Sequence, residues 1–555
     1  MDEATKHYDD HAPLTDSDLF REEETRLIDY NDSMELRQRR NVRTTQLGDS
    51  PPRRVEEKPK LVMEWAKAIV FSLAVVTAFT TYAWMKRTRH FQRKEANYGV
   101  IDKCDLTTYP VWRIDELKEL SLSGCKHTTL PDSPELWSRF KSLKKLDLGD
   151  NSLSDLPDAI GVLSPSLEIL FLSENKFASV PEIIKRLSRL RVLSLRGNHL
   201  TDLTTSNMPT KSLVWLILTN NQITKIDPNI QELKLLRKLM LSHNDVAEIP
   251  LELGQCKNLE LIRLANNNLS NFPIEVLGSL PSLAWISLSG NPMAKSPKSG
   301  EKVINEDQVE LFTSSILGRG ASGIVYRGKF EGKEVAVKMF KSQSKGSDGN
   351  PEDEAAINGL IQHPFVMSAL GIIESYEGSS TAYKGMVMNL LSGTYSIGTV
   401  PNFNTVTRDE GLSKHAKNMN SDKALSVIWN VASALDYIHS SLGVTHGDVY
   451  LHNILMDGRG NALLSDWGAS WVYGRDGSDF SALIEKIEVL AFGRLVEDLV
   501  SWVDLSEQFS RNAQDLLQSI TRADLVSRPT FKEIKNKLLQ IPEFEIFADS
   551  EGSTV

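Results

Sequence analysis

The chain has 555 residues, a length that exceeds one hydrophobic core and predicts several domains or segments. Its formal net charge of −10 gives no whole-chain reason to expect nucleic acid as a partner, so none is predicted. The three cysteines, Cys104, Cys125 and Cys256, include no close pair, which argues against a disulfide framework or a zinc site and favours a reducing compartment.

The N-terminal part of the chain divides into two segments. Residues 1–62 are charged and polar without apolar periodicity, so a disordered tail is predicted, and no cleavable signal peptide. Residues 66–86 differ, because positions 68–85 carry no charge and would span roughly 27 Å as a helix, close to the hydrocarbon thickness of a bilayer. We predict a single transmembrane helix there, with a buried soluble helix as the alternative. Basic residues flank both ends, so charge alone does not set its orientation.

A repeating pattern runs through residues 110–300. Leu143, Leu146, Leu148 and Asn151 spell L-x-x-L-x-L-x-x-N, and the pattern returns with a period of 23 or 24 residues. The repeated asparagines are Asn151, Asn175, Asn198, Asn221, Asn244, Asn267 and Asn291. The pattern resembles that of leucine-rich repeats. The resemblance implies an α/β solenoid of about eight repeats, in which stacked strands bury the leucines and each Asn side chain satisfies backbone groups of a turn.

The outward-facing positions of the short strands are candidates for binding. In a leucine-rich repeat solenoid these positions line the concave face, so we expect a protein or peptide ligand there. The alternative is that they are merely solvated. The candidates are Lys145, Asp147, Phe171, Trp215, Arg263 and Trp285.

Four short motifs follow the repeats in a fixed order. They are G-R-G-A-S-G at 318–323, V-A-V-K at 335–338, H-G-D-V-Y-L-H-N at 446–453 and S-D-W-G at 465–468. Together they resemble the glycine-rich loop, strand lysine, catalytic loop and metal motif of protein kinases. The resemblance implies a bilobal α+β kinase fold over residues 311–545, with a C-terminal tail at 546–555. The spelling is closest to the tyrosine-kinase-like group with H-G-D-x-Y-x-H-N catalytic loops.

The kinase resemblance implies an ATP site between two lobes. Gly318, Gly320 and Gly323 would let a hairpin backbone approach the phosphates closely. The segment at 385–391 resembles the connection between lobes, where the backbone would bond to the adenine; an ordinary buried strand is the alternative. The residues expected to line the nucleotide are Val325, Ala336, Lys338, Met388, Leu390 and Leu455.

The charged residues of the motifs carry the implied chemistry. Lys338 would contact the α- and β-phosphates and needs an acidic partner on the next helix, for which Glu354 is the best candidate. The alternatives on that helix are Glu352 and Asp353. Asp448 would orient the attacking hydroxyl or accept its proton, while Asn453 and Asp466 would hold Mg²⁺ or Mn²⁺.

Several positions depart from the kinase pattern. Gly447 replaces an arginine that usually binds a phosphorylated activation loop, and Tyr450 replaces a lysine that usually steadies the γ-phosphate. His452 could partly substitute for that lysine. Trp467 replaces a phenylalanine, and no A-P-E motif is readable, so the usual partner of Arg528 is unidentified. The four residues that bind nucleotide and metal are intact, so an active enzyme is favoured over a degenerate one.

The favoured hypothesis is a single-pass membrane protein kinase with the repeats and the kinase domain both in the cytosol, since the kinase needs ATP. Its substrate would be a protein hydroxyl, Ser/Thr rather than Tyr. The runner-up is a pseudokinase that binds ATP and assembles partners at a membrane. A receptor with external repeats is opposed because no apolar span separates repeats from kinase, although Asn268 lies in a glycosylation sequon. The polar segment at 394–420 has no predicted role.

Overall fold

The computed structural model describes residues 104–106, 116–297, 302–320, 322–340, 348–349, 351–374, 383–391 and 393–547. The predicted tail at 1–62 and the predicted span at 66–86 lie outside these residues, as do positions 548–555 of the C-terminal tail. No helix within the described ranges is long and apolar enough to cross a membrane. The described residues from Lys118 onward belong to one compact unit.

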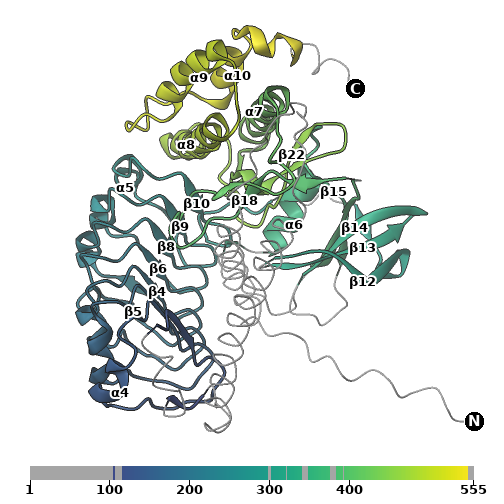
Figure 1. Ribbon diagram of the computed structural model, residues 1–555. Helices are drawn as coiled ribbons and strands as arrows, with labels where there is room; N and C mark the ends of the chain where they lie inside the picture. Colours follow the sequence, from purple (N-terminus) through teal and green to yellow (C-terminus); the bar gives the residue numbers. More distant parts are fainter. Residues whose placement is uncertain are drawn as a thin grey trace, which may run out of the picture. The chain divides into compact units, whose positions relative to one another are not determined.

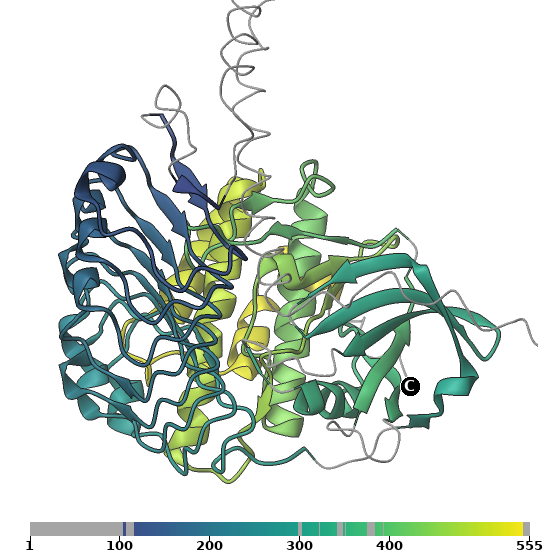
Figure 2. The same ribbon diagram turned by 90° about the horizontal axis from the view of Figure 1, so that it is seen from below.

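The first part of this unit is a parallel sheet of eight short strands, one for each repeat. In stacking order they are β1 (Glu119–Ser121), β2 (Lys145–Asp147), β3 (Ile169–Phe171), β4 (Val192–Ser194), β6 (Trp215–Ile217), β8 (Lys238–Met240), β9 (Leu261–Arg263) and β10 (Trp285–Ser287). The turns of this solenoid follow one another in chain order, from blue to teal in Figure 2. The predicted α/β repeat solenoid is therefore confirmed.

Short helical turns line the side of the solenoid opposite the sheet (Figure 1). They are α4 (Pro134–Ser138), η2 (Asp158–Leu163), η3 (Glu182–Arg186), η4 (Pro228–Glu232), η5 (Leu251–Gln255) and α5 (Ile274–Gly278). Prolines precede or begin these turns, where a missing backbone N–H removes no helical hydrogen bond. A second, two-stranded parallel ladder joins β5 (Asp202–Leu203) to β7 (Lys225–Ile226).

The repeated asparagines hold neighbouring turns together. Asn198 is typical, since its Nδ2 donates to the carbonyl oxygens of Leu172 and Leu195 at 2.9 and 3.0 Å. Its Oδ1 accepts from the backbone N–H of Phe177 at 3.0 Å. One buried amide thus satisfies three backbone groups that water cannot reach. The same arrangement recurs at Asn151, Asn175, Asn221, Asn244, Asn267 and Asn291.

The second part of the unit begins with a six-stranded sheet. Its order is β11 (Val303–Ile304), β15 (Ala369–Glu374), β16 (Tyr383–Asn389), β14 (Lys333–Phe340), β13 (Gly323–Phe330) and β12 (Val309–Arg319), with the turn η6 (Glu306–Gln308) before β12. Alternate residues of β14 face opposite sides of the sheet, as the pleat requires. Val335 and Val337 pack in one apolar cluster, while Ala336 packs in another. Helix α6 (Pro351–Leu360) packs beside β15 and β16.

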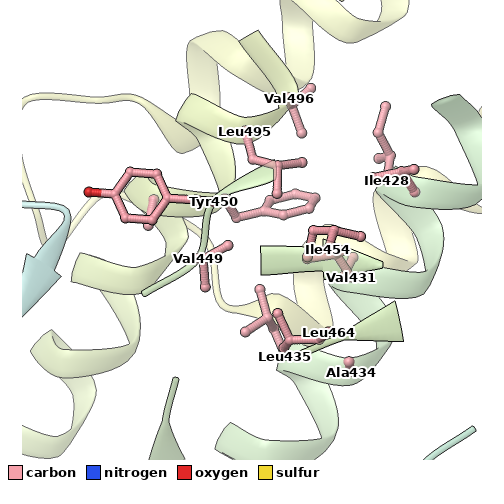
Figure 3. Close-up of a cluster of buried hydrophobic side chains, with 14 of the residues drawn as sticks. Ile428, Val431, Ala434, Leu435, Val449, Tyr450, Ile454, Leu464, Leu495 and Val496 are labelled. Carbon is pink, nitrogen blue, oxygen red and sulfur yellow. The ribbon is translucent and has the colours of Figure 1, made fainter. Parts of the chain in front are cut away.

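A larger, mainly helical lobe follows. Its helices are α7 (Ser421–Tyr437), α8 (Asp479–Trp502), α9 (Glu507–Ile520) and α10 (Phe531–Leu538), with the helical turns η7 (Ile438–Leu442), η8 (Leu451–Asn453) and η9 (Pro542–Phe547). Its short strands are β17 (Tyr395–Ser396), β18 (Gly398–Thr399), β19 (Gly411–Leu412), β20 (Val444–Thr445), β21 (Ile454–Met456), β22 (Ala462–Leu464) and β23 (Trp471–Val472). Figure 3 shows Val449 pointing into the core of this lobe, whereas the hydroxyl of Tyr450 points away from it.

The core of the large lobe continues into the repeats. Five apolar residues of the solenoid strands and their flanks belong to the same buried cluster as the lobe's helices; they are Ile217, Met240, Leu261, Ala284 and Trp285. All five are nearly inaccessible to water. Two segments that the sequence treats as separate domains therefore share one hydrophobic core, and removing either exposes apolar surface of the other.

The cysteines correct one expectation from the sequence. Cys104 and Cys125 are each disulfide-bonded, and the described residues contain one free cysteine, the buried Cys256. The expectation of no disulfide was wrong because sequence separation says little about which thiols a fold brings together. Burial raises the pKa of the Cys256 thiol to about 11, so this thiol stays protonated and unreactive at neutral pH.

Candidate active site

The glycine-rich stretch forms the turn between β12 and β13. The backbone N–H of Gly320 donates to the carbonyl oxygen of Gly323 at 2.9 Å and closes the turn. A Cβ at Gly323 would lie 2.4 Å from the carbonyl oxygen of Met339 on β14, so only glycine fits there. A Cβ at Gly318 would meet nothing within 4 Å, so this glycine answers no steric demand of the fold. Open space beside it is what a bound phosphate chain would need.

The strand lysine has the acidic partner that the sequence favoured. Lys338 on β14 forms an ion pair with Glu354 in the first part of α6, and their side chains are 11% and 2% exposed. Burial alone would lower the pKa of Lys338, but the nearby carboxylates of Glu354 and Asp466 outweigh it and raise the pKa. The two alternatives differ: Glu352 is half-buried, while Asp353 accepts from the backbone N–H of Gly290 in the repeats at 3.1 Å.

Most residues expected to line the nucleotide gather in one place. Ala336 and Met388 are buried in a small apolar cluster, against which Val325 and Leu390 pack. Leu455 lies apart from this cluster, half-buried on β21 opposite Leu463 of β22 and Ser396 of β17. Ala336 and Lys338 are two residues apart on β14 and therefore face the same side of the sheet, so the cluster supplies the apolar part of a site beside the lysine charge.

The catalytic-loop residues meet through direct hydrogen bonds. The Nδ2 of Asn453 donates to Oδ2 and to the backbone oxygen of Asp448, both at 2.9 Å. Asp466 is exposed and has a left-handed backbone, with φ of +61°. Its charge affects the pKa values of Lys338 and of Asp448, so it lies near both. The four residues that the sequence singled out, Lys338, Asp448, Asn453 and Asp466, therefore converge.

Glu488 on α8 fixes the backbone of the catalytic loop. Its two carboxylate oxygens accept from the backbone N–H groups of His446 and Gly447 at 3.1 and 2.6 Å. It also bonds to His439 at 2.7 Å. Burial by itself would raise the pKa of Glu488, but these donors outweigh it and lower the pKa. Glu488 therefore stays ionised and holds the loop. A Cβ on Gly447, whose φ is +74°, would lie 2.5 Å from the carbonyl oxygen of Ala469.

His452 is engaged elsewhere. Its Nδ1 pairs with the buried carboxylate of Asp409, which also accepts from the backbone N–H of His452 at 3.1 Å. Burial alone would lower the pKa of His452, but Asp409 outweighs it and raises the pKa. The segment at 394–420, which had no predicted role, supplies this carboxylate. His452 therefore contributes positive charge near the site, but its ring is held by Asp409.

The sequence missed the nearest cation to Asp448. Arg263 of β9 in the repeats places Nη2 at 2.6 Å from Oδ1 of Asp448, and Nη1 donates to the carbonyl oxygen of Gly447 at 2.9 Å. The side chain of Arg263 is 1% exposed. Burial raises the pKa of Asp448, and Arg263 is the strongest influence opposing that rise. The only signal in the sequence was the place of Arg263 on the concave face.

The residues present fit a divalent cation bound together with a nucleotide. Asn453 and Asp466 offer an amide oxygen and a carboxylate, the hard oxygen ligands that Mg²⁺ prefers. Because Nδ2 of Asn453 is directed to Asp448, its amide oxygen is left to accept other partners. No cluster of three or more His, Cys, Asp or Glu side chains suited to a metal occurs in the described part of the chain.

Comparison with known proteins supports both halves of this description. Residues 312–488 match the protein kinase domain family, and residues 141–200, 188–246 and 234–293 match the leucine rich repeat family. The chain thus carries leucine-rich repeats followed by a protein kinase domain, as the motifs predicted.

Among the relatives, a probable serine/threonine-protein kinase of Dictyostelium discoideum is 31% identical over 172 residues, which are 31% of this chain and 11% of the relative. A G-type lectin S-receptor-like serine/threonine-protein kinase of Arabidopsis thaliana is 28% identical over 217 residues, 35% of this chain and 25% of the relative. A probable leucine-rich repeat receptor-like protein kinase of Arabidopsis thaliana is 27% identical over 172 residues, 31% of this chain and 20% of the relative. The chain therefore spans a quarter or less of the length of these relatives.

Proposed function

We propose that this chain is an ATP-dependent protein kinase that transfers the γ-phosphate of ATP to protein hydroxyl groups. The observation that carries the proposal is one domain holding both the Lys338–Glu354 ion pair and the Asp448–Asn453 hydrogen bond. Phosphoryl transfer demands little covalent chemistry from the protein and depends on positioning and charge neutralisation. These two contacts place a cation and an oriented carboxylate in the same domain, beside the glycine turn.

Each residue has a defined part in the proposed reaction. Asp448 orients the attacking hydroxyl and accepts its proton, while Asn453 holds the Asp448 carboxylate in place through Oδ2. Lys338, fixed by Glu354, binds the α- and β-phosphates, and the glycine turn allows a close backbone approach. Asn453 and Asp466 would hold the divalent cation, Mg²⁺ or Mn²⁺, which would neutralise the charge on the phosphate oxygens.

We propose serine or threonine as the acceptor. The supporting observation is that relatives matched by the kinase domain are named serine/threonine-protein kinases. Position 450, where a lysine would favour this class, holds Tyr450, which stacks on Trp285 of the repeats. Peptide arrays with matched Ser, Thr and Tyr acceptors test the assignment. Selective labelling of tyrosine peptides contradicts it.

The main experiment measures turnover of ATP and phosphate incorporation by the full chain. Asp448→Asn and Lys338→Met should each abolish phosphorylation of the chain itself and of substrate peptides. Matched controls on the exposed first turn of α7 are Asp422→Asn and Lys423→Met, which make the same chemical changes outside the site. Equal phosphorylation by wild type, Asp448→Asn and Lys338→Met would show that the proposed function is wrong.

The second candidate is a pseudokinase that binds ATP and acts as a scaffold. The observation that favours it is that Oδ1 of the Asp448 carboxylate is already engaged by Arg263 of the repeats at 2.6 Å. Magnesium-dependent ATP binding without phosphorylation of any protein in a broad substrate panel supports this candidate. Turnover that disappears in Asp448→Asn excludes it.

We also propose that the chain is anchored by the segment 66–86, uncharged at positions 68–85, in a single-pass arrangement with the repeats and kinase in the cytosol. The support is the length and apolarity of that stretch together with the need for ATP. The disulfide bonds of Cys104 and Cys125 point the other way, because disulfides persist in oxidising compartments. Protease protection of sealed vesicles tests the topology, and glycosylation at Asn268 in cells contradicts it.

A protein or peptide ligand on the concave face of the repeats remains part of the proposal, with a constraint from the structure. Phe171 and Trp215 both contact Phe403 of the kinase segment at 394–420, with ring centroids 5.9 Å apart in each pair. Arg263 and Trp285 contact the catalytic loop. A ligand that uses these four residues has to displace the kinase domain. Surface plasmon resonance with and without these residues mutated measures that competition.

A further inference from the structure

The repeats contact the kinase domain at three of the places where it departs from the usual pattern. Gly447 replaces an arginine, Tyr450 replaces a lysine, and Arg528 has no readable A-P-E partner. In the structure the carbonyl oxygen of Gly447 accepts from Arg263, the ring of Tyr450 stacks on Trp285, and Arg528 donates to a repeat carbonyl. Contacts missing within the domain are therefore replaced by contacts from outside it.

Arg263 makes the most direct of these contacts. Besides its bonds to Asp448 and Gly447, its Nε donates to Oδ1 of Asp348, which lies three residues before the start of α6, at 2.8 Å. All three bonds use different nitrogens, so the planar guanidinium is held in one orientation. Burial alone would lower its pKa, but Asp448 and Asp348 outweigh it and raise the pKa, so Arg263 stays charged. A fixed cation thus lies against the catalytic carboxylate.

Neighbouring repeat residues hold the loop in the position that Arg263 requires. The rings of Trp285 and Tyr450 lie 4.4 Å apart with an interplanar angle of 7°, and Nε1 of Trp285 donates to the carbonyl oxygen of Val449 at 3.1 Å. A Cβ at Gly447 would also come within 3.2 Å of the carbonyl oxygen of Ile286. Glycine at this position therefore allows the β10 strand to pass close to the loop.

Arg528 is a second residue of the kinase domain that bonds to the repeats in place of its usual partner. Its Nη2 donates to the carbonyl oxygen of Pro281, in the last full repeat, at 2.7 Å. Its other bonds go to the carbonyl oxygens of Arg522 and Lys486 at 2.8 and 3.0 Å. Burial lowers the pKa of this guanidinium to about 10, and three carbonyl oxygens accept hydrogen bonds from it. The repeats therefore complete the hydrogen bonding of a buried cation in the large lobe.

The candidate active site stays assembled while the repeats contact the kinase domain. The Lys338–Glu354 ion pair and the Asp448–Asn453 bond are both present while Arg263 is bound. Arg263 uses Oδ1 of Asp448 and Asn453 uses Oδ2, and the Asp448 side chain is still 20% exposed. The shared apolar core makes separation of the repeats from the large lobe unfavourable. These features suit a permanent component of the site better than a removable cover.

We propose that Arg263 is a positioning residue for phosphoryl transfer: the repeats supply the guanidinium that holds the Asp448 carboxylate in one orientation, in place of the cation absent at position 450. The inference rests on the proposed kinase function and adds to it a requirement for the repeats. Without Arg263 the Oδ1 atom of Asp448 loses its 2.6 Å partner, so the carboxylate can turn away from the attacking hydroxyl.

The test compares Arg263→Ala, Arg263→Gln and Arg263→Lys with wild type in the full chain. Loss of one fixed charge at a transition state typically lowers kcat about 100-fold. We expect that loss in the Ala and Gln variants, with the KM for ATP little changed because Lys338 and the glycine turn are untouched. Arg263→Lys keeps the charge but not the planar guanidinium, so its kcat should lie between that of wild type and that of Arg263→Ala. Added guanidinium ion should restore part of the turnover of Arg263→Ala, and none to Asp448→Asn.

The control is Arg196→Ala, an equally buried arginine whose ion pair, 2.9 Å long, is to Glu174 of the repeats themselves. Its kcat should match wild type after correction for any change in melting temperature. A higher kcat in the Arg263 variants would identify an autoinhibitory lock and overturn the proposal, and an unchanged kcat would make Arg263 a bystander. No turnover by wild type would refute the kinase function itself, whereas wild-type turnover with unaffected Arg263 variants refutes this inference alone.

Discussion

Trp285 offers a quantitative test of the shared core. It is 2% exposed, stacks on Tyr450 and donates to a catalytic-loop carbonyl. Replacing a buried tryptophan by alanine typically lowers the free energy of unfolding by about 4 kcal/mol, and loss of the aromatic pair is part of that figure. Trp285→Phe keeps a ring and loses mainly the hydrogen bond, about 1 kcal/mol. The order of stability should be wild type, Trp285→Phe, Trp285→Ala.

A matched control separates stability from catalysis. Trp137 is fully buried on α4, and its Nε1 donates to the carbonyl oxygen of Pro131 at 2.9 Å, so it resembles Trp285 in size, burial and bonding. Trp137→Ala should destabilise the chain by a similar amount. At a temperature where both variants are folded, only Trp285→Ala should lose activity. Roughly 100-fold is the scale expected when a catalytic group is misplaced by about 1 Å.

The assay is urea unfolding followed by both far-UV circular dichroism and tryptophan fluorescence, with ATP turnover measured on the same samples. A shared core predicts that the later repeats and the large lobe unfold in one transition, at the urea concentration where ATP turnover is also lost. Trp285→Ala should move the midpoint of that transition to lower urea. Two well-separated transitions, one for the repeats and one for the kinase domain, both unaffected by Trp285→Ala, would refute the reasoning.

The remaining predictions concern pH, backbone strain and truncation. Burial raises the pKa of Asp448, and Arg263 opposes that rise. Because Asp448 acts as a base only above its pKa, removing the opposing charge in Arg263→Gln should move the acid limb of the kcat–pH profile to higher pH. Initial rates measured across the pH range test this prediction. Gly447→Ala should abolish turnover, because the added Cβ would lie 2.5 Å from a backbone oxygen. The control is Gly460→Ala, whose φ is also positive, at +91°, but whose Cβ would enter open space. This control should lower the free energy of unfolding by only about 1 kcal/mol and keep turnover. The 305–555 fragment should aggregate or show little turnover on gel filtration and kinase assay, because the repeat side of its core is gone.

The repeats could be predicted closely because their physics is local and periodic. Each Leu and Asn position recurs every 23 or 24 residues, and every asparagine makes the backbone bonds that its spacing suggested. The kinase motifs were also readable, since Lys338, Asp448, Asn453 and Asp466 lie in short stretches whose order is informative. Glu354 was selected over Asp353 by its spacing, and the structure gives the two residues different partners, Lys338 and Gly290.

The rest depended on contacts that no local pattern records. Arg263 and Asp448 are 185 positions apart, and the strand that carries Arg263 looked like a ligand-binding surface. His452 was considered a substitute cation, but Asp409 holds its ring, and Asp409 lies in a segment without a recognisable motif. Trp285 was chosen as a candidate for binding a partner, and in the structure its ring stacks on Tyr450 of the chain's own catalytic loop.

The stacking of the repeats sets a limit on how this protein can change over evolution. Solenoids commonly gain or lose whole units, because each unit contacts only its neighbours. Here the strands β9 and β10 are fixed against the catalytic loop, and inserting one unit after them would displace Arg263 by about 4.8 Å, the spacing between strands, out of reach of Asp448. Further toward β1, Lys145 of β2 and Phe171 of β3 contact Phe403 and not the catalytic loop, so units in that part of the array are constrained less directly. Duplications and deletions should therefore be tolerated at the N-terminal end of the array and excluded at the end that adjoins the kinase.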